Sequence, residues 1–201
     1  MKQKKISKQK IKSIKKGLFQ IGILGVISTI IGFILDKTII RLANSLSFQM
    51  MNYIFITITT LGETYIFVLI AAVLTIALMA YRKPVVSFVL SIFSALFIIW
   101  LLKYIIDRPR PFEIGLTSAG VAANWSSFPS GHTLVFFTII PMVAKKFPKL
   151  KTIFWMIAIL VGLSRIYLGV HYASDVIAGA FIGYGIGWTF MRIEEKYRWS
   201  I

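Results

Sequence analysis

The sequence predicts an all-α protein that crosses a membrane several times. Of its 201 residues, 57% are hydrophobic and only 15% are charged, whereas a soluble domain carries about a quarter of its residues as charges. Several long stretches contain no charged residue, and the basic residues lie between these stretches. The composition therefore excludes an ordinary soluble domain, and the absence of cysteine excludes a disulfide scaffold.

Six apolar runs predict six transmembrane helices. Three are long enough to span roughly 30 Å of hydrocarbon as helices, at 18–35, 64–81 and 84–102. Three shorter runs follow at 133–144, 152–164 and 176–191. Because a backbone in lipid must satisfy its own hydrogen bonds, we expect each run to be helical. Residues 46–58 mix polar and apolar side chains, and we expect a helix along the membrane surface there.

The basic residues predict the orientation. Seventeen of the 23 lysines and arginines precede the first run, separate runs two and three, separate runs four and five, or follow the sixth. The positive-inside rule places these positions, and hence both termini, in the cytoplasm. The predicted organisation is a basic cytoplasmic arm (1–17), a six-helix transmembrane domain (18–191) with outer loops at 36–63, 103–130 and 165–175, and a cytoplasmic tail (192–201). Because the basic residues flank apolar spans, the net charge of +16 indicates the bilayer as partner and no nucleic acid.

A second group of polar residues falls on the predicted outer side. It contains Lys103, Arg108, Arg110 and Arg165 together with both histidines of the chain, and these histidines are His132 and His171. Ionisable groups at membrane depth are costly, so they are candidates for function. Lys103, Arg110 and Arg165 would suit a multiply charged anion if they converged, and phosphate fits best.

The segment Pro129-Ser130-Gly131-His132 leads directly into the fourth run. Proline and serine suit a helix start, and Gly131 would let a ligand approach the backbone closely. A helix N-terminus offers free N–H groups and a partial positive charge, which favour an anion. His132 would then lie in the first turn, beside the bound group.

His171 and Asp175 are four residues apart, so on one helix they would share a face. A carboxylate there would fix the imidazole tautomer and leave the other ring nitrogen free to attack. Beside a phosphate, His171 is the better nucleophile because it has this partner. His132 is then the general acid for the departing oxygen.

A metal centre is the main alternative chemistry. The predicted outer side offers carboxylates on separate segments, namely Asp36, Glu63, Asp107, Glu113 and Asp175. Metal-assisted phosphatases need clustered ligands, so the sequence favours a reaction with no metal and no other cofactor.

The polar residues together match a known three-part signature. Lys103-x6-Arg110-Pro111, then Pro129-Ser130-Gly131-His132, then Ser164-Arg165-x5-His171-x3-Asp175 resembles the type 2 phosphatidic acid phosphatase superfamily. The resemblance implies a metal-independent hydrolase that passes through a phosphohistidine. In it, His171 would attack phosphorus, Asp175 would hold His171, and His132 would protonate the leaving group. The phosphoryl oxygens would be held by Lys103, Arg110, Ser130, Gly131 and Arg165.

Two functions from different classes follow from this resemblance. The first is a cell-membrane lipid phosphatase with an extracytoplasmic site, acting on undecaprenyl diphosphate or phosphatidylglycerophosphate. The second is a catalytically idle relative that binds lipid phosphates or assists their transport. Every signature position is present, which favours the enzyme.

Arg108 has two candidate roles, contact with a second phosphate or an ion pair with Asp107.

Overall fold

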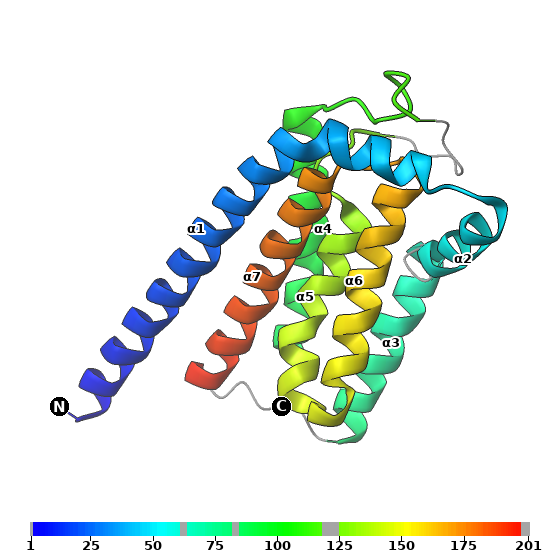
Figure 1. Cartoon of the computed structure of the whole chain (residues 1–201). Helices are drawn as coiled ribbons and strands as arrows, with labels where there is room; N and C mark the ends of the chain where they lie inside the picture. The colour runs from blue at the N-terminus through cyan, green and yellow to red at the C-terminus, as the bar shows by residue number, and fades with distance from the viewer. Residues whose placement is uncertain (1, 61–63, 82–84, 118–124, 198–201) are drawn as a thin grey trace.

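A computed structural model describes residues 2–60, 64–81, 85–117 and 125–197. Every regular element in these ranges is helical (Figure 1). The elements in chain order are α1 (Lys2–Ser45), α2 (Gln49–Thr60), α3 (Thr64–Ala80), α4 (Val86–Ile106), α5 (Gly131–Lys146), a short 3₁₀ helix (Pro148–Leu150), α6 (Lys151–Tyr167) and α7 (Ala173–Tyr197). The all-α class predicted from the sequence is confirmed.

The short helix α5 lies at the centre of the bundle and packs against α4, α6 and α7. Ten of its 16 residues are buried, and they lie on every side of the helix. A helix that is apolar all round belongs in a protein interior. Around it, Phe67 and Leu74 of α3, Phe88 of α4 and Val161 of α6 complete the core.

The contact between α5 and α7 is made through glycines. A Cβ atom added at Gly183 would lie 2.1 Å from the carbonyl oxygen of Leu134, and one at Gly187 would lie 1.9 Å from that of Thr138. Together with Gly179 these residues recur every fourth position, the small-residue spacing that lets transmembrane helices approach closely. The backbone of α7 is therefore held directly against α5.

Helix α1 approaches α7 in the same way at Gly32. A Cβ atom added there would lie 3.0 Å from Cα of Ser174, in the first turn of α7. Asp36 follows one turn later on the same face of α1 and is buried. Beyond this point α1 runs across the end of the bundle toward α2 (Figure 1).

Four of the six apolar runs lie wholly within α1, α5, α6 and α7, the run 64–81 extends one residue beyond α3, and the run 84–102 begins before α4. The segment 46–58, expected to form a helix, overlaps α2. The helices exceed the runs: α1 continues to Ser45 and α4 to Ile106. A charge-free run ends at the first charged residue, which is Asp36 in α1 and Lys103 in α4, whereas a helix continues as long as its backbone hydrogen bonds do. Among the described residues, four helices are long and apolar enough to cross a membrane, over Ile11–Ser45, Val86–Ile106, Pro148–Tyr167 and Ala173–Lys196. A shorter apolar helix covers Ile66–Ala80.

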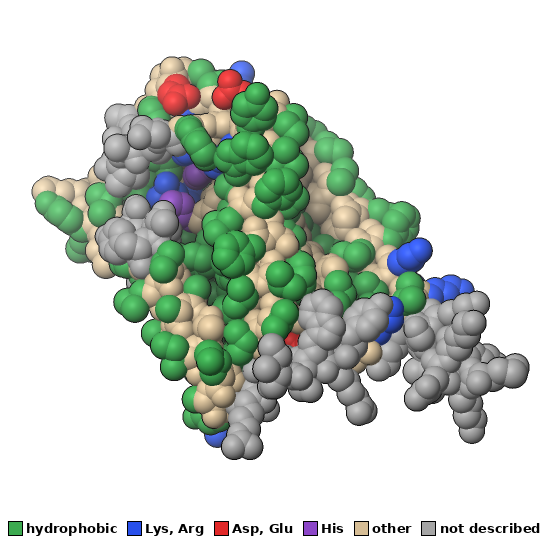
Figure 2. Space-filling model, turned by 180° about the vertical axis from the view of Figure 1, so that it is seen from behind, with side chains coloured by type: hydrophobic (Ala, Val, Ile, Leu, Met, Phe, Trp, Pro, Cys, Tyr) green, Lys and Arg blue, Asp and Glu red, His purple; other side chains and the backbone are tan. Residues whose placement is uncertain are grey.

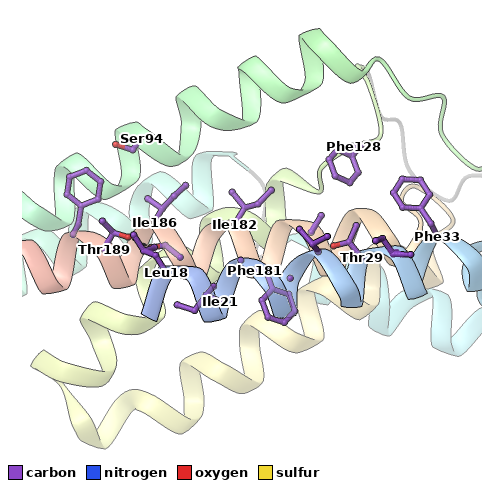
Figure 3. Close-up of a pocket in the computed structure, with 17 residues that line it drawn as sticks. Leu18, Ile21, Thr29, Phe33, Ser94, Phe128, Phe181, Ile182, Ile186 and Thr189 are labelled. Atoms are coloured by element: carbon purple, nitrogen blue, oxygen red, sulfur yellow. Dashed lines mark hydrogen bonds between the residues drawn. The ribbon is translucent and has the colours of Figure 1, made fainter. Parts of the chain in front are cut away.

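An apolar groove of about 600 Å³ lies between α1, α4 and α7 (Figure 3). One end of the groove is lined by Leu18 and Thr189, and the other end by Phe33 and Phe128. The rings of Phe33 and Phe128 stack with their centroids 6.2 Å apart. The groove thus ends at Phe33, whose ring contacts the guanidinium of Arg108.

Candidate active site

The polar residues singled out in the sequence meet at one end of the bundle, called here the site end. It is formed by the end of α4, the start of α5, the end of α6 and the start of α7. Figure 2 shows histidine side chains beside lysine and arginine in a hollow of the surface there. Three segments far apart in the sequence thus supply one cluster.

His171 lies at the centre of this cluster and is 2% exposed. Its Nδ1 atom is 3.4 Å from Oδ2 of Asp175, and its Nε2 atom is 3.3 Å from Nη1 of Arg110. With the proton on Nδ1, facing the carboxylate, Nε2 carries the lone pair and faces the guanidinium. A phosphoryl oxygen bound by Arg110 would therefore bring its phosphorus to Nε2.

The prediction that His171 and Asp175 share one helix is wrong. Helix α7 begins at Ala173, so His171 belongs to the preceding turn. The two side chains still meet because Asp175, in the first turn of α7, reaches back and accepts the backbone N–H of Tyr172 at 3.0 Å. This is the carboxylate half of a capping box. The Ser127 hydroxyl donates to the same Asp175 oxygen at 2.5 Å.

The surroundings of His171 keep its ring neutral. Burial lowers the pKa of His171 to about 3, the charges of Arg110 and Arg165 act in the same direction, and Asp175 opposes them. A neutral imidazole retains the lone pair that a nucleophile needs. At neutral pH, His171 therefore keeps a lone pair on one ring nitrogen.

His132 is the second residue of α5. Its Nε2 atom is buried and has no hydrogen-bond partner among the described residues. The positive charges of Arg165, Arg110 and Lys103 are all close enough to act on the ring. A buried nitrogen without a partner is costly unless something binds it, and a substrate oxygen would supply that partner.

The three predicted phosphate-binding cations converge on this cluster. Arg110 donates from Nη1 to the carbonyl oxygen of Val170 at 2.8 Å and from Nε to that of Trp125 at 2.9 Å. The charge of Lys103 interacts with those of Arg110 and Arg165, and its Nζ donates to the carbonyl oxygen of Ser126. These contacts fix cations that would otherwise repel one another.

Arg165 is held by a residue that the sequence analysis did not single out. Its Nη1 atom donates to Oγ1 of Thr59 on α2 at 2.5 Å. Both side chains are buried. Helix α2 therefore contributes to the site end.

Ser130 and Gly131 lie where the sequence places them, immediately before and at the start of α5. The Ser130 hydroxyl does not cap the helix; it lies 3.0 Å from Oγ1 of Thr133. The Ser130 backbone N–H donates to the carbonyl oxygen of Asp175 at 3.0 Å, which ties α5 to α7. A Cβ atom at Gly131 would meet Ile99 at 3.6 Å, an ordinary contact, so no protein atom crowds this position.

Arg108 has a partner set that the sequence analysis missed. Its ion pairs are with Asp175, 2.6 Å from Nη1, and with Asp36, 2.8 Å from Nη2. The expected pair with Asp107 is not among its ion pairs, because Asp107 ends α4 in the left-handed conformation, with φ at 38°. Asp36 had a visible signal in the sequence: it is the first charged residue after an 18-residue apolar run.

The site end does not fit a metal ion. In the ranges that the structure describes, no three histidine, aspartate or glutamate side chains are grouped to hold one. Asp36 and Asp175 both bind the Arg108 guanidinium, so a cation already occupies the space that they share. Glu63 lies outside the described residues.

Comparisons with known proteins identify the class. The family model described as the PAP2 superfamily matches residues 84–199, and the chain belongs to this superfamily. The chain is 30% identical over 168 residues to the undecaprenyl-diphosphatase of Sulfolobus acidocaldarius, covering 82% of this chain and 80% of the relative. It is 35% identical over 108 residues to phosphatidylglycerophosphatase B of Bacillus subtilis, covering 48% and 51%.

The fold is also similar to solved structures. The crystal structure of a transmembrane PAP2-type phosphatidylglycerolphosphate phosphatase from Bacillus subtilis aligns with a TM-score of 0.76 and 25% identity, over 90% of this chain and 96% of the other. Aquifex aeolicus LpxE aligns with a TM-score of 0.68 and 31% identity, over 78% and 94%. The chain is thus a multi-pass membrane protein and a hydrolase of phosphate esters of the PAP2 type.

Proposed function

We propose that His171 is the nucleophile of this lipid phosphatase and that the reaction passes through a phosphohistidine. The observation that carries the proposal is the placement of the imidazole between Asp175 and Arg110. One ring nitrogen faces a carboxylate that fixes the tautomer, and the other faces a cation that would bind the phosphoryl group. Because both distances exceed 3.2 Å, a bound substrate would tighten the contacts, as is common for catalytic hydrogen bonds.

In the first step, Nε2 of His171 attacks the terminal phosphorus and the bond from phosphorus to the leaving oxygen breaks. The bound phosphate anion offsets the cations around His132, and the protonated ring gives its proton to that oxygen. Lys103, Arg110 and Arg165 stabilise the charge on the equatorial oxygens, and the backbone at Ser130 and Gly131 lies at the positive end of α5. The phosphorylated ring is cationic, and Asp175 balances its charge.

In the second step, His132, now neutral, takes a proton from water. The resulting hydroxide attacks the phosphohistidine, the bond between phosphorus and Nε2 breaks, and inorganic phosphate leaves. His171 returns to its neutral form and His132 to its protonated form. The cycle consumes one water molecule and needs no metal or other cofactor.

We further propose six membrane crossings with both termini in the cytoplasm and the site end facing outward. Supporting this arrangement, α1 begins and α7 ends at the same end of the bundle, opposite the site end (Figure 1). The arm (1–17), the transmembrane phosphatase domain (18–191) and the tail (192–201) then keep the sequence-based boundaries. The protein would lie in the cell membrane with its active site extracytoplasmic.

The proposed substrate is undecaprenyl diphosphate, with phosphatidylglycerophosphate as the second candidate. Relatives carry both names. An outward site favours the diphosphate, because that carrier lipid is released outside during wall synthesis. The bilayer delivers either lipid laterally, with its phosphate at the depth of the site end.

The test is phosphate release by detergent-purified protein, with a chelator present, from undecaprenyl diphosphate, phosphatidylglycerophosphate and phosphatidic acid. Wild-type protein should release phosphate from at least one lipid, and His171→Ala should lower kcat by about a thousandfold or more. Terminally labelled substrate should leave an acid-labile label on wild-type protein and none on the variant. Turnover retained by His171→Ala would remove His171 as the nucleophile.

A further inference from the structure

We propose that Asp36 on α1 is a positioning residue for the catalytic carboxylate, acting through Arg108 and Ser174. This inference rests on the proposed function, because it assumes that Asp175 orients the nucleophile. Asp36 lies outside the segment matched by the family model, residues 84–199. The N-terminal helix would thus contribute to a reaction whose signature lies in the C-terminal part of the chain.

Asp36 is 3% exposed and makes contacts through both carboxylate oxygens. Its Oδ1 atom accepts the backbone N–H of Ser174 at 2.9 Å. Its Oδ2 atom accepts the Ser174 hydroxyl at 2.6 Å and Nη2 of Arg108 at 2.8 Å. Both carboxylate oxygens are therefore engaged, and all their partners adjoin Asp175.

Arg108 links Asp36 to Asp175. Its Nη1 atom donates to Oδ1 of Asp175 at 2.6 Å and to the Ser174 hydroxyl at 2.7 Å. Its guanidinium carbon lies 3.8 Å from the ring centroid of Tyr172 and 4.4 Å from that of Phe33. The rings and the two carboxylates fix both the plane and the direction of the guanidinium.

The pair with Arg108 fixes which oxygen of Asp175 faces His171. Because Arg108 occupies Oδ1, Oδ2 is the oxygen that receives Ser127 and faces His171. The carboxylate cannot rotate without losing its pair with Arg108. Asp36 also binds the Arg108 guanidinium and so prevents it from turning wholly toward Asp175. More of the negative charge of Asp175 is therefore left to interact with the imidazole of His171.

A close approach of two helix backbones brings α1 to this point. Gly32 allows the backbones of α1 and α7 to meet at Ser174, and Asp36 lies one turn beyond Gly32. The first N–H groups of a helix lack intrahelical acceptors. At the start of α7, Asp175 satisfies the Tyr172 N–H and Asp36 satisfies the Ser174 N–H. Asp36 therefore fixes the helix turn that carries the catalytic carboxylate.

The test compares Asp36→Asn with the wild-type protein in the phosphate-release assay. The amide keeps an acceptor for Ser174 but loses the charge that holds Arg108. We expect kcat to fall about tenfold, since small misplacements of catalytic groups are costly, and KM to change by less than about twofold. The matched control is Glu195→Gln, which breaks ion pairs with Lys145 and Arg192 near the other end of α7 and should leave kcat unchanged.

A coupling measurement separates positioning from a general loss of structure. In an Arg108→Gln background, Asp36→Asn should cost less than about threefold further, because the two residues act as a unit. Ser174→Ala provides a second variant in case Asp36→Asn does not fold. It retains both charges but loses the hydroxyl, and kcat should fall about threefold. Thermal unfolding in the same detergent identifies the folded variants.

The outcomes distinguish this inference from the proposed function. An unchanged kcat in folded Asp36→Asn and Ser174→Ala, or a rise in KM alone, would overturn the role of Asp36 while the effect of His171→Ala stands. Equal decreases for Asp36→Asn in the wild-type and Arg108→Gln backgrounds would also overturn it. Wild-type protein that releases no phosphate from any lipid would instead contradict the proposed function itself.

Discussion

The two halves of the chain use their side chains in opposite ways. In the C-terminal half, α5 is enclosed by its neighbours, and Arg110, Arg165, His171 and Asp175 are each less than 5% exposed. In the N-terminal half, α1 exposes large apolar side chains along its length, such as Phe19 at 68% and Ile34 at 75%. These polar groups of the site end are thus enclosed by protein contacts, whereas α1 carries large apolar side chains on its surface. Asp36 belongs to α1, yet its carboxylate is buried and contacts residues of the site end.

The largest expected effect in this comparison comes from changing a buried arginine while keeping its charge. Arg110→Lys retains a cation but loses the planar fork that contacts Trp125, Val170 and His171. We expect kcat to fall about a hundredfold, within the range for loss of one stabilising donor. Arg192→Lys, at a 40% exposed side chain near the other end of α7, is the control and should change kcat by less than about twofold.

A smaller effect is expected from adding one methyl group to each half. At Gly183 the new Cβ atom would lie 2.1 Å from a backbone oxygen of α5, whereas at Gly22 it would meet no atom within 4 Å. Gly183→Ala should therefore lower the free energy of unfolding by about 2 kcal/mol. Gly22→Ala should leave it unchanged or raise it slightly, because alanine favours helix. Unfolding of both variants in one detergent measures the difference, and equal stability would contradict the close packing of α5 and α7.

The smallest expected effect is an absence of titration. In a His132→Asn variant, His171 is the single histidine, and its ¹⁵N resonances should stay those of a neutral ring from pH 8 to pH 5. The reason is the pKa of His171, which burial lowers to about 3. Because the unfolded chain takes up this proton near pH 6.5 and the folded chain does not, acidification below pH 6.5 should destabilise the fold. A titration midpoint near pH 6.5 would mean that water reaches the ring.

The sequence predicted the helices well because lipid leaves the backbone few alternatives. It also selected Lys103, Arg110, His132, Arg165 and His171 from three separate segments, and the fold brings them together. The spacing of His171 and Asp175 was interpreted as a shared helix face, yet four residues also separate a turn residue from the carboxylate of a capping box. The chemistry of phosphate binding limited which residues could form the site. The four-residue spacing, in contrast, was compatible with two local structures, a shared helix face or a turn followed by a capping box.

Long-range pairing was beyond the reach of the sequence pattern. Arg108 and Asp36 are 72 positions apart, and their contact depends on how α1 packs against α7. Thr59 reaches Arg165 across 106 positions for the same kind of reason. The spacing of Gly179, Gly183 and Gly187 was a readable signal that α7 packs closely against another helix, but it did not identify that helix as α5.

The enclosure of α5 has a consequence for the insertion of the protein into the membrane during synthesis. This helix has 16 residues and contains Pro141, and it is not among the four helices that are long and apolar enough to cross a membrane. In the proposed six-helix topology, α5 therefore depends on neighbouring helices to settle in the bilayer. Helices α6 and α7 are synthesised after it, so a nascent chain would be anchored well before its active site assembles. Catalytic competence would then be acquired only after α7 has been synthesised.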